Sequence, residues 1–195
     1  MLEPGRLYLT RCGFPGARLM RDTDGMSILK WLGLETAGGP EPIDGLGAVE
    51  RALDDLEPAQ ARYLASFAYI LGRVARADQE VRDVEVRMME QMVAERGGLP
   101  AEQAALVVTI ATREGLRHGG TEDFIVTRDF AATATRDQKL ALLDCLFAVS
   151  AADQSIRTVE DNAIRQIASE LRLEHADFIA ARRAHASHLR VLKKE

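Results

Sequence analysis

A nine-residue phrase that occurs twice decides the fold of this chain. The first copy is Ala77-Asp78-Gln79-Glu80-Val81-Arg82-Asp83-Val84-Glu85, and the second is Ala152-Asp153-Gln154-Ser155-Ile156-Arg157-Thr158-Val159-Glu160. The copies lie 75 residues apart and share six identical positions. Each copy, called an acidic phrase below, follows one stretch of helical apolar spacing and precedes another. Each therefore predicts a bend between two helices.

Apolar residues on both sides of the acidic phrases repeat at helical spacing, again with the offset of 75. In the helices before the phrases, the expected buried residues are Leu64, Phe67, Ala68, Leu71, Val74 and Ala75, then Leu142, Leu143, Leu146 and Val149. In the helices after the phrases, they are Val81, Val84, Met88, Met92 and Val93, then Ile156, Val159, Ala163, Ile167 and Ala168. The duplication thus extends to the predicted core.

These patterns predict two units, residues 58–117 and 136–190, each built as helix, acidic phrase, helix, turn and helix. A short helix from Thr121 joins them, and the last helix is expected over 174–190. One unit exposes an apolar face that it cannot cover alone, so two units should pack against each other. The expected fold class is all-α, a compact bundle of about seven to eight helices made of two duplicated units with pseudo-twofold symmetry.

The first 43 residues are expected to be an N-terminal extension and linker, poorly ordered in part, ahead of a helical domain at 44–195. Gly38, Gly39, Pro40 and Pro42 mark the linker, and a helix is expected over 45–55. Residues 1–25 lack sustained periodicity and are interpreted as an upstream extension or a mis-set start. The alternative is a short edge strand over residues 7–9, or docking on the bundle.

Composition excludes several classes of function. The net charge of -5 and the pI near 5.5 argue against a general nucleic-acid binder. Cys12 and Cys145 are isolated, as expected of free thiols in a reducing cytosol. No apolar run has the length that a membrane span needs. The phosphate-loop, nucleophile-elbow and zinc-protease motifs do not occur in the sequence, so we expect a protein that is not an enzyme.

The acidic phrases offer carboxylates in a repeated pattern. Asp78 and Glu85 are seven residues apart, as are Asp153 and Glu160. A bend between helices can bring the two carboxylates of a phrase together, and clusters of oxygen ligands suit hard cations such as calcium or magnesium. The spacing is not that of an EF-hand, whose ligands include a Glu at the twelfth position of the loop.

A second interpretation of the same residues is purely structural. If Arg82 and Arg157 are N-caps, Glu85 and Glu160 lie at the N3 position of a capping box, where a glutamate accepts the N-cap amide. The two aspartates can accept local amides in the bend. Arginine cannot supply the side-chain acceptor that completes such a box.

The pattern Ala-Asp-x-x-[Val/Ile]-x-x-x-Glu between helices, present twice, resembles the tellurite-resistance TerB family, also seen in the N-terminal part of DjlA-like membrane co-chaperones. The resemblance covers residues 44–190 and implies a compact bundle of about seven helices. It also implies a divalent metal bound by acidic residues, which are here Asp78, Glu85, Asp153 and Glu160.

The chain departs from the family pattern at two positions of each phrase. Gln79 and Gln154 stand where the family has Gly, which suits a left-handed turn. Arg82 and Arg157 stand where the family has Ser or Thr, and they bring positive charge beside the expected cation.

By resemblance, we expect a non-enzymatic binding module in metal or tellurite stress response. It would bind a divalent cation and act in the cytoplasm, at the inner membrane face, through other proteins. The alternative is a protein-interaction or scaffold domain in which the acidic phrases are only helix caps. A third hypothesis is a hydrolytic or metal-dependent enzyme that uses the carboxylates.

Overall fold

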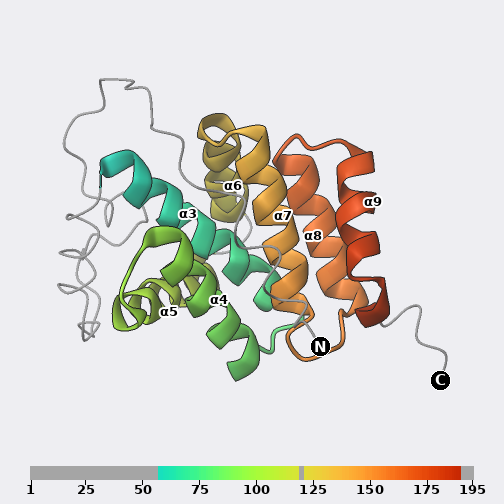
Figure 1. Cartoon of the computed structure of the whole chain (residues 1–195), viewed down its shortest axis with the longest axis horizontal. Helices are drawn as coiled ribbons and strands as arrows, with labels where there is room; N and C mark the ends of the chain where they lie inside the picture. Colours follow the sequence, from blue (N-terminus) through green and yellow to red (C-terminus); the bar gives the residue numbers. More distant parts are fainter. Residues whose placement is uncertain (1–56, 119–120, 190–195) are drawn as a thin grey trace.

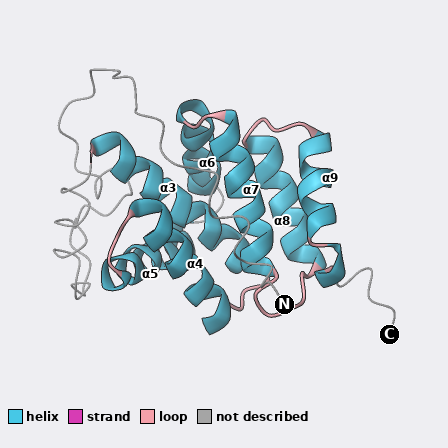
Figure 2. Cartoon of the chain, viewed as in Figure 1, coloured by secondary structure: helices cyan, strands magenta, loops and turns pink. Residues whose placement is uncertain are grey.

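The fold was analysed in a computed structural model, which describes residues 57–118 and 121–189, with the side chains of 113–118 and 121–122 excepted. The expectations for residues 1–43 and for the helix at 45–55 lie outside this part. The described residues form seven α-helices and one 3-10 helix and contain no strand, so the all-α prediction is confirmed (Figure 2). In chain order they are α3 (Pro58–Ala75), α4 (Asp83–Gly97), α5 (Ala101–His118), α6 (Thr121–Thr133), α7 (Arg136–Ser150), α8 (Thr158–Glu170), α9 (His175–Ala184) and η2 (Ala186–His188).

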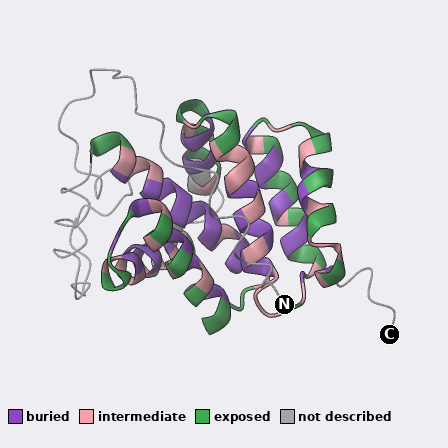
Figure 3. Cartoon of the chain, in the orientation of Figure 1, coloured by how far each residue is buried: buried purple, intermediate pink, exposed green. Residues whose placement is uncertain are grey.

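Helix α3 lies at the centre of the bundle and packs on α4, α5, α6, α7 and α8 (Figure 1). Helix α7 contacts α3 and α4 on one side and α8 and α9 on the other. The faces turned toward these neighbours are buried, whereas the outer faces of α4, α6 and α9 are exposed (Figure 3). Every residue predicted to be buried in α3 and α7 is buried. The pseudo-twofold relation between the two units stays a prediction.

Local sequence explains where the helices begin and end. Pro58 occupies the first turn of α3, where its missing N–H leaves no helical hydrogen bond unmade. Helix α4 ends at Gly97 and is capped by Gly98, whose φ of 63° is the left-handed conformation that glycine adopts without strain. Helix α7 begins with a complete capping box, in which Thr135 accepts the Gln138 amide and Gln138 accepts the Thr135 amide.

At the start of α4 and of α8, the buried position is one residue later in the sequence than predicted. Val81, Val84 and Val159 were expected in the core, but they are 37%, 36% and 48% exposed. The glutamates that follow the last two valines are buried instead, Glu85 at 0% and Glu160 at 1% exposure. The physical reason is the cap: each glutamate turns inward to accept the amide at the start of its own helix.

The last helix is shorter than predicted. Helix α9 ends at Ala184 rather than 190, and the chain passes through η2 into an extended residue, Leu189. There the Ile156 amide donates to the His188 carbonyl at 2.7 Å, and Leu189 forms a single parallel bridge with Ile156. Both side chains are 1% exposed, so burial of this apolar pair replaces the last predicted helical turn.

A buried ionic network ties α3 to α6 and α8. The Arg73 guanidinium lies 2.6 Å from the Glu170 carboxylate, and the two side chains are 9% and 8% exposed. Arg73 also donates to the backbone carbonyl of Asp123 in α6 and to the Thr127 hydroxyl. Since a buried charge is stable only when it is paired, this network fixes the relative positions of the three helices.

Candidate functional site

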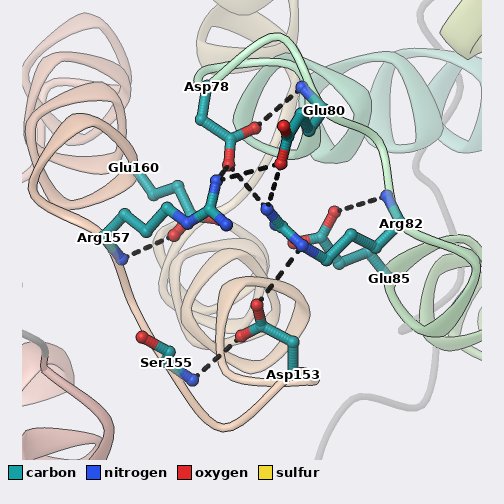
Figure 4. A network of polar contacts seen from close by, with 8 residues as sticks. All are labelled: Asp78, Glu80, Arg82, Glu85, Asp153, Ser155, Arg157 and Glu160. Carbon is teal, nitrogen blue, oxygen red and sulfur yellow. Dashed lines mark hydrogen bonds and ion pairs between the residues drawn. The ribbon is translucent and has the colours of Figure 1, made fainter.

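The two acidic phrases span the loops α3–α4 and α7–α8 and the first turns of α4 and α8, and their side chains meet in one cluster (Figure 4). Both loops turn at the same place, since Gln79 and Gln154 each have a φ of 67°. A side chain with a β-carbon is disfavoured in this left-handed conformation. Glutamine thus stands at the position where the resemblance implies glycine, and the loop still adopts the left-handed turn that glycine favours.

Backbone amides of the loops hold each predicted site carboxylate. Asp78 accepts the Glu80 amide at 3.0 Å, and Asp153 accepts the Ser155 amide at 2.9 Å. Glu85 accepts the Arg82 amide at 3.1 Å. Glu160 accepts the Arg157 amide at 2.6 Å. Arg82 and Arg157 are thus the N-caps of α4 and α8, and the glutamates supply their half of the capping box.

The Arg82 guanidinium lies among carboxylates from both loops. Its nitrogens approach carboxylate oxygens of Asp78 at 3.2 Å, Glu80 at 2.9 Å and Glu85 at 3.4 Å, all in its own acidic phrase. Its Nε lies 3.5 Å from the carboxylate of Asp153 in the other loop. One positive group therefore contacts three of the four residues predicted to bind a metal.

The Arg157 guanidinium in turn contacts carboxylates of the first acidic phrase. Its Nη1 donates to the Asp78 carboxylate and lies 3.5 Å from that of Glu80. Each loop thus supplies an arginine to the other. Charge-assisted hydrogen bonds of this kind are stronger than neutral ones, and here they join loops that are far apart in sequence.

Burial and charge shift the pKa values of the cluster in opposite directions. Burial raises the pKa of Glu160 to about 7, with the negative charges of Glu85, Asp78 and Asp153 adding to the effect. Burial likewise raises the pKa of Glu85. Burial would also raise the pKa of Asp78, but the Glu80 amide and the two guanidinium groups outweigh it and lower that pKa.

One member of the cluster was not identified from the sequence. Glu80 contacts both guanidinium groups, yet its counterpart in the second acidic phrase is Ser155. A comparison that retains only the carboxylates present in both phrases therefore leaves Glu80 out. Its position within the first phrase was the available signal. With Glu80 the cluster holds five carboxylates and two guanidinium groups, a formal charge of -3 when all are ionised.

The residues of the cluster do not fit a divalent metal. Oxygen ligands of such an ion must face one point that is free of positive charge. Here the Arg82 guanidinium occupies the space between the carboxylates of Asp78, Glu85 and Asp153. In the described part of the chain, no three His, Cys, Asp or Glu side chains are grouped so that they can hold a metal ion.

Comparison with known proteins identifies the family. The family model of tellurite resistance protein TerB matches residues 64–183. No curated protein and no solved structure matches the chain. Within the described ranges, no helix is both long enough and apolar enough to span a bilayer. The match runs from α3 to α9 and includes both acidic phrases, and the chain therefore belongs to the TerB family.

Proposed function

We propose that this protein is a non-enzymatic binding module of the TerB family that works in tellurite or metal stress response through contacts with another protein. The acidic phrases then cap α4 and α8 and join the two loops, and they bind no divalent cation in the native chain. The proposal also places the protein in the cytoplasm, at the inner membrane face, where its partner would hold it.

The observation that carries this proposal is the engagement of the predicted metal ligands by the chain itself. Asp78, Glu85 and Asp153 each accept a backbone amide and contact the Arg82 guanidinium. A divalent cation would have to displace the Arg82 guanidinium from these oxygens, because two positive groups at the same place repel each other.

The partner contact in this proposal is the loop end of the bundle. Val81, Val84 and Val159 are exposed, and each lies within two residues of Arg82 or Arg157. These apolar side chains are not part of the core cluster, and they are near in sequence to an ionic cluster with a formal charge of -3 when all of its groups are ionised. A partner segment that combines aliphatic and basic side chains has the complementary chemistry.

Isothermal titration of the wild-type protein with calcium, magnesium, manganese and zinc tests the first half of the proposal. We expect no saturable binding. The opposite result is a stoichiometric heat that disappears when Asp78→Asn and Asp153→Asn are combined. That result would establish a cation-binding module and overturn the proposal.

Photo-cross-linking in cells tests the second half. A photoreactive side chain at Val159, which is 48% exposed, is compared with one at Phe124, which is 47% exposed and lies on α6. We expect a discrete adduct from position 159 alone. The identified partner, once purified, should bind the wild type at least about tenfold more tightly than a Val84→Ser/Val159→Ser variant. Equal adducts at both positions, no adduct at 159, or unchanged affinity would contradict the proposed contact.

A further inference from the structure

We infer that residues 26–34 of this chain, Met-Ser-Ile-Leu-Lys-Trp-Leu-Gly-Leu, dock on the outer face of α6 over Phe124 and Ile125. Residues 26–34 are called the Trp31 segment below, and they lie outside the described part of the chain. The inference concerns a different surface from the loop end that the proposed function assigns to a partner. It does not depend on that function.

The outer face of α6 exposes two large apolar side chains that follow each other in the sequence. Phe124 is 47% exposed and Ile125 is 44% exposed. In the described ranges, no other two consecutive large apolar residues are exposed to this extent. Contact with a second apolar surface would remove both side chains from water, which is favourable.

The Trp31 segment supplies such a surface. Six of its nine residues are apolar: Met26, Ile28, Leu29, Trp31, Leu32 and Leu34. Trp31 is the only tryptophan of the chain. Aromatic and branched aliphatic side chains gain most from leaving water, and an aromatic side chain such as Phe124 is a favourable partner for an indole.

Helix α3, which follows the Trp31 segment in the chain, runs beside α6 in the opposite direction. The rings of Tyr63 and Phe130 lie 5.2 Å apart between centroids. At the other end of α3, Arg73 donates to the Asp123 carbonyl at 3.2 Å. The start of α3 at Pro58 is therefore near the end of α6, and the apolar face at the start of α6 is one helix length away.

The connection to α3 is long enough for the Trp31 segment to reach this face. Between residues 58 and 73 helix α3 rises by roughly 22 Å, which is the distance to be covered along α6. Residues 35–57 join the segment to α3 and span up to about 80 Å when extended. A tether of this kind gives an effective concentration on the order of millimolar, so that even weak docking is populated.

Charges beside the two surfaces favour α6 over the loop end as the docking site. On α6, Arg128 and Asp129 each follow one of the two exposed apolar residues by four positions, and so they lie beside them. The segment contains Lys30 and is followed by Glu35, which gives one opposite charge for each. The loop end has five carboxylates around two guanidinium groups, and it favours a more basic occupant.

The fluorescence of Trp31 measures the docking, because the full chain has no other tryptophan. The wild type is compared with Phe124→Ser/Ile125→Ser, called the α6 variant. The matched control is Val84→Ser/Val159→Ser, called the loop variant, which removes the same number of exposed apolar side chains at the loop end. Far-UV circular dichroism checks that both variants fold, as expected for changes at exposed positions.

We expect the wild type to emit at a shorter wavelength than a free peptide of residues 24–36, and to be quenched less by acrylamide. The α6 variant should lose both differences and emit like the peptide. The loop variant should keep both. Wild-type emission equal to that of the peptide, or protection that persists in the α6 variant, overturns the inference and leaves the proposed function intact. Protection lost in the loop variant overturns the inference and also contradicts the proposed partner contact.

Photo-cross-linking of the purified full chain locates the docked segment without either double variant. A photoreactive side chain replaces Ile125, and the control replaces Ile179, which lies on α9 and is 36% exposed. We expect an adduct within one chain, from position 125 to residues 26–34, when the product is analysed by mass spectrometry. No such adduct at 125, an equal adduct at 179, or an adduct that joins two chains overturns the inference.

Discussion

Arg157 donates a hydrogen bond to Asp78, a residue 79 positions earlier in the chain and in the other acidic phrase. The reciprocal contact joins Arg82 to Asp153 at 3.5 Å. The two loops are thus cross-linked by a pair of charge-assisted contacts, one in each direction. These two contacts connect the N-cap of α4 to the N-cap of α8, and so they hold the α3–α4 loop against the α7–α8 loop.

The contacts between the two loops predict that Asp78 contributes more to the free energy of unfolding than Asp153 does. Asp78 is contacted by both arginines and its side chain is 6% exposed, whereas Asp153 forms an ion pair with Arg82 and not with Arg157, and its side chain is 19% exposed. We expect Asp78→Asn to lower the free energy of unfolding by about 1–3 kcal/mol, and Asp153→Asn by less. Urea unfolding of both variants measures this, and equal losses would contradict the asymmetry.

The stability of the protein should fall as the pH rises through the range in which Glu160 ionises. Burial raises the pKa of this carboxyl from 4.5 to about 7. Because its folded-state pKa is raised, the native state retains a proton that the unfolded state loses. The contribution to stability is fully present below pH 4.5 and is lost as the pH rises to 7. Burial raises the pKa of Glu85 as well, which adds a slope of the same sign.

Glu160→Gln tests this pH dependence. A glutamine oxygen can still accept the Arg157 amide, but it does not ionise. The variant should therefore show a smaller loss of unfolding free energy between pH 5 and pH 7, measured by urea unfolding at each pH. Glu95→Gln, which changes an exposed carboxyl on α4, is the control for the substitution. A slope equal to that of the wild type would show that Glu160 does not titrate in this range.

The left-handed turn in the first acidic phrase should be improved by glycine. Gln79 is exposed with a φ of 67°, a conformation that costs a residue with a β-carbon about 1 kcal/mol. Gln79→Gly should raise the free energy of unfolding by about 0.5 kcal/mol, the relief being partly offset by the freer unfolded chain. Gln91→Gly, in the interior of α4, should lower it by about 1 kcal/mol. Destabilisation by both changes would show that the turn is not strained.

The buried ion pair between α3 and α8 should matter more than an exposed one. Glu170→Gln leaves the Arg73 guanidinium, whose side chain is 9% exposed, without its nearest counter-charge. We expect a loss of about 3–5 kcal/mol of unfolding free energy. Arg136→Gln breaks a pair in which the arginine side chain is 58% exposed to solvent, and should lower the free energy of unfolding far less. Chemical unfolding of both variants decides this, and comparable losses would count against the difference in burial.

The sequence by itself determined the helices and their main faces. Apolar residues at helical spacing placed the cores of α3 and α7, and Pro58 and the glycine pair 97–98 placed the helix limits, because these signals are local. The repeated phrase located both loops and singled out the four carboxylates that meet there. It also led to the family that the comparison then identified.

The tertiary structure decided what the carboxylates contact and which apolar residues lie outside the core. Whether Glu85 or Val84 faces inward depends on a capping hydrogen bond, which shifts the buried face by one residue. The length of α9 depends on Leu189 meeting Ile156 from a distant part of the chain. The partners of Arg82 and Arg157 depend on the approach of two loops 75 residues apart, and such long-range pairing leaves no mark in local periodicity.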